Sequence, residues 1–241
     1  FWSQANGIAI AGKYVDTSLV SVPYSIMTFK NFEKKFPDGQ VLSSKTGLTR
    51  KYDVSPYGVY RESKAIFFPM ASKPVKALNG KAFVYGIDVE GATKAYDPGL
   101  VEVTSRGVKA DKVGNKDIVV WMDEDGVLRV NERGENTFSY PSAGGLKDKL
   151  GYVWTVEKTT GDLVLGEKRL VAIKTLRTFW FFWSALNPDT ELFANVRGKG
   201  LVDGAIELKE DEGSDESDSV KIDVDPTKFP SENSKIEVET K

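Results

Sequence analysis

The chain has no cysteine and no histidine among its 241 residues. Without thiols it has no disulfide, no zinc–thiolate site and no cysteine nucleophile. Without imidazoles it has no histidine base, which excludes serine-hydrolase triads, zinc hydrolases and most redox metal sites. We therefore expect neither a metal site nor a cofactor, and any catalysis would have to rely on carboxylates and tyrosines.

Long hydrophobic runs are also absent. The most apolar stretch, residues 179–186, is far too short to cross a bilayer, so no membrane span is expected. The formal net charge of -2 is unevenly distributed, because residues 203–241 carry a net charge of -8 and the remainder a net charge of +6. The basic charge is diffuse and no basic run is interleaved with exposed aromatics, so nucleic-acid binding is not expected.

What the chain does have is an aromatic run, Thr178–Phe193, whose frame recurs at Thr28–Leu42. Five pairs of residues match at a constant separation of 151 positions: Phe29 and Trp180, Phe32 and Trp183, Pro37 and Pro188, Asp38 and Asp189, and Val41 and Leu192. Apolar residues three and four apart, followed by Pro-Asp, predict a short helix, a turn and then a strand in both copies. The second helix is apolar nearly all round, which predicts that it is buried.

The likeness continues upstream of both helices. Trp2 and Trp154 each precede a pair of glycines, and Gly7–Gly12 matches Gly161–Gly166. Leu19-Val-Ser-Val22 likewise matches Leu170-Val-Ala-Ile173. A match at this many positions indicates an internal repeat. The alternative is that two aromatic helices merely look alike.

Between the two copies the pattern is β-rich. Lys81–Val89 and Ala92–Tyr96 predict one hairpin, and Lys116–Met122 and Val127–Val130 predict a second around Asp123–Gly126. Further strands are expected at Asn136–Tyr140 and Tyr152–Val156, and few other segments look helical. The predicted fold class is α+β, mainly antiparallel β, with two related β-rich units that each carry a short aromatic helix.

Four segments follow from these patterns. Residues 1–44 are the first, truncated unit, 45–78 a packed irregular connector, 79–202 the second unit and 203–241 an acidic tail. The tail is expected to be disordered, because it has too few apolar side chains to offset its ordering entropy. The alternative is that residues 221–224 and 235–239 add as strands to a protein partner or to another copy of the chain.

The connector holds the most interesting polar cluster, formed by Tyr57, Tyr60, Arg61 and Glu62. Tyrosine and arginine together suit recognition of a sugar, a peptide or a carboxylate. The alternative is a packed irregular segment with an Arg–Glu pair.

Three other motifs have both a functional and a structural interpretation. Asp38 and Asp189 are a symmetric carboxylate pair that could act on a glycosidic bond, but aspartate after proline usually caps its own turn. Asp123–Gly126 could be part of a calcium loop, but turn chemistry favours a hairpin. Trp180–Trp183 could bind a flat ligand or a sugar, but such dense aromatics favour a core.

Three blocks of sequence, taken in order, resemble the prokaryotic domain of unknown function 3179 family: Phe1–Gly12, then Ser55–Ser63 with Phe67-Phe-Pro69, and Phe179–Phe193. The resemblance covers about residues 1–196 and implies an extracytoplasmic protein, periplasmic, secreted or surface-attached, with no known reaction. Family members carry an earlier Cys-Pro-Leu-Cys-like motif that this sequence does not contain, and Phe1 suggests a processed or incomplete chain. We predict a non-enzymatic binding or assembly subunit. The alternative is a carboxylate-dependent enzyme acting on carbohydrate or cell-envelope substrate.

Overall fold

The structure is a computed structural model that describes residues 1–206, except 4–6, 21, 23, 56, 68–71, 73 and 197–199. The chain divides into two compact units, which are described separately. The larger unit comprises residues 1–37 and 68–209, and the smaller comprises residues 38–67 and 210–241.

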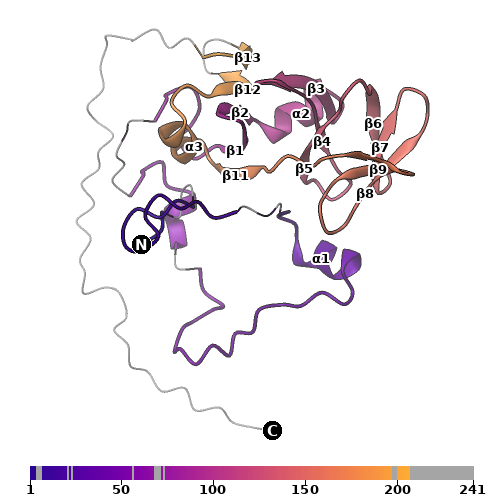
Figure 1. The fold of residues 1–241 in the computed structure, drawn as a ribbon. Coiled ribbons are helices and arrows are strands. Elements are labelled where there is room, and N and C mark those ends of the chain that lie inside the picture. The colour runs from indigo at the N-terminus through magenta and orange to yellow at the C-terminus, as the bar shows by residue number, and fades with distance from the viewer. Residues whose placement is uncertain are drawn as a thin grey trace. The chain divides into compact units, whose positions relative to one another are not determined.

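The larger unit contains three β-sheets (Figure 1). The first has the order β11-β1-β2-β12-β13, built from β1 (Phe83–Val89), β2 (Ala92–Tyr96), β11 (Leu176–Phe179), β12 (Glu191–Val196) and β13 (Gly200–Gly204). The second has the order β10-β9-β8-β7-β6, built from β6 (Phe138–Ser142), β7 (Gly145–Asp148), β8 (Val153–Val156), β9 (Leu163–Leu165) and β10 (Lys168–Leu170). The third is β3-β4-β5, built from β3 (Val108–Val113), β4 (Lys116–Met122) and β5 (Leu128–Glu132). The strands described pair antiparallel except for β12 with β2, so the predicted mainly antiparallel α+β class is confirmed.

The third sheet is the middle layer because β4 is apolar on both faces. Ile118 and Val120 join the core shared with the first sheet, whereas Val119 and Trp121 join the core shared with the second. All four side chains are buried. Since alternate residues of a strand point to opposite faces, the continuous run Ile118–Trp121 places β4 between two packed layers.

The aromatic helix α3 (Trp180–Leu186) covers the other face of the first sheet. Trp180 and Trp183 are buried there against Val84 of β1 and Leu192 of β12. Each indole donates one hydrogen bond, Trp180 to the carbonyl of Val75 (2.6 Å) and Trp183 to the hydroxyl of Thr190 (2.9 Å). The prediction that these tryptophans form a core is confirmed.

The two copies of the aromatic frame have the same local backbone conformation. Helix α1 (Phe29–Lys35) and α3 begin and end 151 positions apart, and their C-caps have φ, ψ of -130°, 72° and -129°, 73°. Upstream, Ser3 N–H donates to Ile8 and Gly7 N–H donates to Ser3, and the residues 154 positions later repeat both bonds in the turn Glu157–Asp162.

Beyond these segments the copies differ. Helix α1 has no fully buried residue, whereas α3 has four. The prediction of a strand after Pro37-Asp38 is wrong, because residues 39–43 form no strand and Val41 is exposed. In the second aromatic frame, β12 does follow the helix and the turn. A strand needs a neighbour to satisfy its backbone, and the described residues give Val41 none.

One helix was not expected from the sequence. The segment Asp97-Pro-Gly99 begins α2 (Pro98–Thr104). The Asp97 carboxylate caps it by accepting from the N–H groups of Gly99 and Leu100, and proline at the first helical position is pre-organised for a helix start. The seven-residue helix is held by Val101, which is buried in the core between the first and third sheets.

In the smaller unit the structure describes residues 38–67 except 56. A short 3-10 helix, Gly58–Arg61, is its one regular element in that range, and Tyr60 packs on Phe67 with ring centroids 4.6 Å apart. Residues 207–241, with the proposed tail strands, lie outside the described residues. No helix of the described part of the chain is long and apolar enough to cross a membrane.

Candidate functional site: a cavity walled by two hairpin turns and an aromatic helix

The first wall of the candidate site is the β4–β5 turn, which a single carboxylate organises. Asp123 accepts through Oδ1 from the N–H groups of Asp125 (3.0 Å) and Val127 (2.9 Å), and through Oδ2 from Arg129 Nε–H (2.7 Å). The strands on either side pair as predicted, with Met122 opposite Leu128. Asp123 thus serves the hairpin, and no group of three His, Cys, Asp or Glu residues that could hold a metal ion lies within the described ranges.

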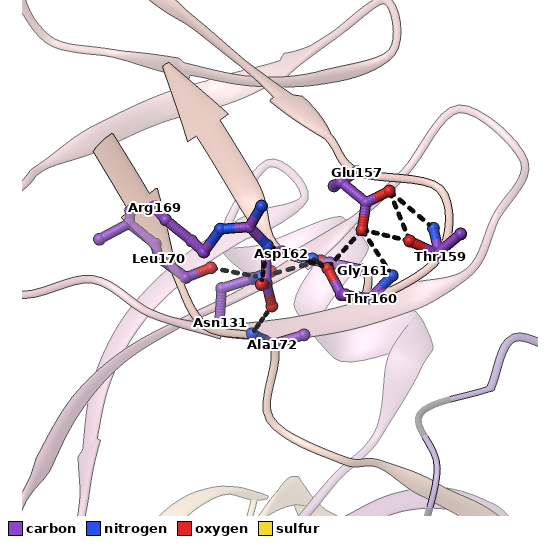
Figure 2. Close-up of polar contacts among 9 residues, drawn as sticks. All are labelled: Asn131, Glu157, Thr159, Thr160, Gly161, Asp162, Arg169, Leu170 and Ala172. Carbon is purple, nitrogen blue, oxygen red and sulfur yellow. Dashed lines mark hydrogen bonds and ion pairs between the residues drawn. The ribbon is translucent and has the colours of Figure 1, made fainter. Parts of the chain in front are cut away.

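The second wall is the β8–β9 turn, organised by Glu157 (Figure 2). Its carboxylate accepts hydrogen bonds from both the hydroxyl and the backbone N–H of Thr159 and of Thr160. The hydroxyl bonds, 2.6 and 2.7 Å from Thr159 and 2.7 Å from Thr160, contribute most to lowering the pKa of Glu157 to about 2. The carboxylate is therefore ionised at neutral pH, and both threonine hydroxyl protons point at it.

Asn131 on β5 joins these two walls. Its side-chain amide donates to the carbonyls of Gly161 (3.1 Å) and Leu170 (3.4 Å), and its carbonyl accepts from the indole N–H of Trp121 (3.0 Å). Asn131 is completely buried, so leaving these groups unpaired would be costly. The two bonds from the amide nitrogen cross from β5 of the third sheet to the β8–β9 turn and to β10 of the second sheet (Figure 2).

Behind this wall, Asp162 secures the segment that leaves β10. It accepts from the N–H of Ala172 (2.7 Å) and from Arg169 Nη1 (2.5 Å). Burial alone would raise the pKa of Asp162, but these hydrogen bonds outweigh it and lower the pKa. Asp162 thus acts as an ionised anchor for the strand exit.

The third wall is the segment that contains α1. Phe32 and Phe36 lie on one helical face, with ring centroids 5.6 Å apart, and both line the cavity. Thr28 begins the helix by accepting from the N–H of Asn31 (3.3 Å). Lys35 holds the helix to the first wall by donating to Asp125 (2.7 Å).

These three walls enclose a cavity of about 540 Å³. Small-molecule sites in proteins have volumes of roughly 300 to 1,000 Å³ and combine apolar walls with a few placed polar groups. The lining provides the two phenylalanine rings, the threonine hydroxyls and four cationic side chains: Lys34, Lys35, Arg129 and Lys158. Asp123, Glu124 and Asp125 are its carboxylates. The arrangement is suited to holding a ligand.

The cluster predicted from the connector, Tyr57, Tyr60, Arg61 and Glu62, lies in the smaller unit, and its binding role stays a prediction. Tyr57 is 63% exposed, whereas Tyr60 is buried against Phe67, and burial raises the pKa of its hydroxyl. Glu62 is exposed, and the side chain of Arg61 lies outside the described residues. The Tyr60 ring therefore packs within its own segment.

A second polar cluster lies around Lys94 of β2. The buried ammonium contacts Asp203 (2.8 Å), Asp111 (3.1 Å) and Glu191 (3.2 Å). Burial alone would lower the pKa of Lys94, but the hydrogen bonds and charges of Asp203 and Asp111 raise it. Burial would likewise raise the pKa of Asp203, yet Lys109 and Lys94 lower it. The ammonium and the three carboxylates around it join β2, β3, β12 and β13.

Sequence reasoning missed most of the cavity. Asp123–Gly126 was predicted as a hairpin turn, but nothing in the sequence placed it beside α1 or the β8–β9 turn. The detectable signal was Glu157, which lies two positions before Thr159 and three before Thr160. Such a spacing marks a turn that is closed by a side chain of its own residues. Asp189, one of the symmetric aspartates, does not line the cavity.

The comparisons with known proteins give a family and no activity. No curated protein and no solved structure matches the chain. The family model described as "Protein of unknown function (DUF3179)" matches residues 1–190, which is well over half of the chain. The chain therefore belongs to the DUF3179 family.

Proposed function

We propose that this protein is a non-enzymatic binding protein whose small organic ligand occupies the cavity between α1 and the two hairpin turns. The observation that carries the proposal is the lining. It combines an aromatic face with hydroxyls and cations, and its turns are held by side-chain bonds. Such pre-organised walls lose little entropy when a ligand binds.

The carboxylates of the site favour binding over catalysis. Asp123 is committed to the β4–β5 turn and to Arg129, and Asp125 is paired with Lys35. Glu157 is saturated by hydrogen bonds from its own turn. A general acid at neutral pH needs a raised pKa, whereas the pKa of Glu157 is lowered.

A screen with a blocked cavity tests the proposal. Sugars, carboxylic acids, nucleotides, amino acids and aromatic compounds would be scanned by thermal shift and each hit measured by calorimetry. Asn31→Trp places a bulky ring in the cavity, and Glu33→Trp, at an exposed position of the same helix outside the lining, is the matched control. We expect one-to-one binding that Asn31→Trp abolishes and Glu33→Trp preserves. The proposal fails if no compound binds, or if binding survives Asn31→Trp.

The enzymatic alternative draws on the Lys94 cluster. Because three carboxylates contact one nitrogen within 3.2 Å, their contacting oxygens lie within about 6 Å of one another, a separation compatible with a retaining glycosidase. A reducing-end assay on a panel of polysaccharides, with Asp203→Asn as the inactive control, tests this alternative. Turnover that is lost in Asp203→Asn would support it, and absence of turnover would reject it.

We also propose that the acidic tail mediates self-assembly or contact with a protein partner, because its two alternating segments suit addition to an exposed sheet edge. Light scattering of the full chain would be compared with a variant carrying Ile222→Asp and Ile236→Asp. An oligomer that both chains form, or a monomer in both, would contradict this role.

Two further proposals concern origin and location. We infer that the two aromatic frames arose by duplication, a view supported by the matching helices and hydrogen-bonded turns. Extracytoplasmic location, in the periplasm, in the medium or at the cell surface, is proposed on the family resemblance. Cell fractionation with an antibody against the chain tests it, and recovery in the cytoplasm alone would refute it.

A further inference from the structure

The charges that line the cavity do not cancel. Asp123 pairs with Arg129, and Asp125 pairs with Lys35. Lys34, Lys158 and Glu124 are the remaining charged lining residues, and none of them has an ion pair within the described part of the chain. Among the described residues the lining thus holds two ammonium groups and one carboxylate without an ion pair, and this excess of positive charge favours an anion.

The threonines of the β8–β9 turn offer the opposite chemistry. Their hydroxyl protons are directed at Glu157, which is ionised and cannot donate in return. Thr159 therefore presents its oxygen lone pairs as acceptors. An anion would be repelled there, whereas a neutral hydroxyl would donate to Thr159. The hydroxyl of Thr160 already accepts from Arg169 (3.4 Å) and from the N–H of Asp162 (3.3 Å), which leaves Thr159 as the freer of the two.

A third property of the ligand follows from α1. The Phe32 and Phe36 rings line the cavity and are only partly buried. A ligand that covers them needs an apolar face beside its polar edges, as the C–H face of a pyranose ring provides.

We propose that the ligand is an acidic sugar, a pyranose that carries a carboxylate or phosphate group. Its anionic group pairs with Lys34 and Lys158, a ring hydroxyl donates to Thr159, and its C–H face covers Phe32 and Phe36. This inference rests on the proposed binding function, because it names the ligand class of the same cavity.

Three probes separate the contributions: glucuronic acid, glucose 6-phosphate and neutral glucose, each measured by calorimetry on the full chain. We expect one of the two acidic sugars to bind at least tenfold more tightly than glucose, and its binding to weaken as salt increases. The preferred acid identifies the anionic group. The inference is overturned if neither acid binds more tightly than glucose.

Matched variants locate the groups involved. Lys34→Gln and Lys158→Gln should each weaken binding of the acidic sugar by roughly three- to fivefold, as expected of a partly exposed ion pair, and leave glucose binding unchanged. Lys30→Gln, on the same helix but outside the lining, is the control. Thr159→Val should weaken both the acidic sugar and glucose, because it removes the acceptor. Circular dichroism of each variant checks that the fold is retained.

The outcomes distinguish this inference from the proposed function. Compounds that bind in an Asn31→Trp-sensitive way but are neutral or cationic would overturn the acidic-sugar assignment and leave cavity binding standing. Binding of acidic sugars that Lys34→Gln and Lys158→Gln together leave unchanged would also overturn it. If nothing binds, both proposals fall.

Discussion

The contact between Gly86 and Trp183 gives the sharpest test of how the aromatic helix is held. A Cβ atom at Gly86 of β1 would lie 2.3 Å from Cε3, 2.4 Å from Cζ3 and 2.5 Å from Cδ2 of the Trp183 indole. Carbon atoms in contact are about 3.5 to 4.0 Å apart, so the ring would have to move by roughly 1 Å. The substitution Gly86→Ala therefore tests whether α3 can shift on its sheet.

The expected cost follows from what restrains the ring. Trp183 is buried and donates to Thr190, which is buried as well. Overpacking a core costs about 1 to 3 kcal/mol, and losing the indole hydrogen bond costs about 1 kcal/mol more. Replacing glycine in a strand returns about 0.5 to 1 kcal/mol. Gly86→Ala should thus lower the free energy of unfolding by about 1 to 3.5 kcal/mol.

The assay is urea unfolding followed by tryptophan fluorescence and by circular dichroism. Gly99→Ala is the matched control, because its Cβ would meet only Asp97 at an ordinary 3.5 Å and alanine favours a helix. We expect it to be neutral or stabilising by up to about 1 kcal/mol. In a Trp183→Ala background the clash disappears, so Gly86→Ala should then cost at least 1 kcal/mol less than in the wild type, a coupling typical of contacting residues. A cost of Gly86→Ala below about 0.5 kcal/mol in the wild type would refute the reasoning, since that is the scatter of neutral surface changes.

Three further predictions rest on single polar groups. Asn131→Ala removes the acceptor of the Trp121 indole and the donor to two carbonyls, and should lower the free energy of unfolding by about 2 to 4 kcal/mol in urea titrations; a change under about 1 kcal/mol would contradict its bridging role. Asp97→Ala removes the cap of α2 and should cost about 0.5 to 2 kcal/mol, whereas Asp97→Asn should retain most of the stability. The pKa of Asp203 is lowered in the fold, so its contribution to stability is present above the unfolded pKa of about 3.9 and is lost as pH falls through the folded pKa. The pKa of Lys94 is raised, so its contribution to stability is present below the unfolded pKa of about 10.4 and is lost as pH rises through the folded pKa. Melting temperatures from pH 2 to 11 check this, and an acid limb that Asp203→Asn leaves unchanged would contradict it.

Much of the fold could be predicted because its signals are local. The hairpins with turns at Glu90-Gly91 and Asp123–Gly126 were predicted from strand alternation and turn residues. These signals involve only a few neighbouring positions. The burial of α3 followed from its lack of a polar face. Helix α2 was missed because seven residues carry little periodicity, although Asp97-Pro98 is a recognised helix start.

The candidate site could not be predicted in the same way. Its walls are α1, the β4–β5 turn and the β8–β9 turn, which lie near residues 32, 125 and 159. No local sequence pattern predicts that these three segments line one cavity. The predicted cluster at Tyr57–Glu62 relied on residue types alone. The structure shows that Tyr60 packs on Phe67, and the binding role of the cluster stays a prediction.

The sequence by itself determined the positions of most strands, the burial of the aromatic helix and the family. These depend on composition and on interactions between near neighbours, which a single chain carries in its order. The tertiary structure decided which face of β4 meets which sheet, where Asn131 and Lys94 find their partners, and that two turns and one helix line one cavity. Such long-range pairings depend on the closing of the core, where burial makes each unsatisfied polar group costly and so selects one arrangement.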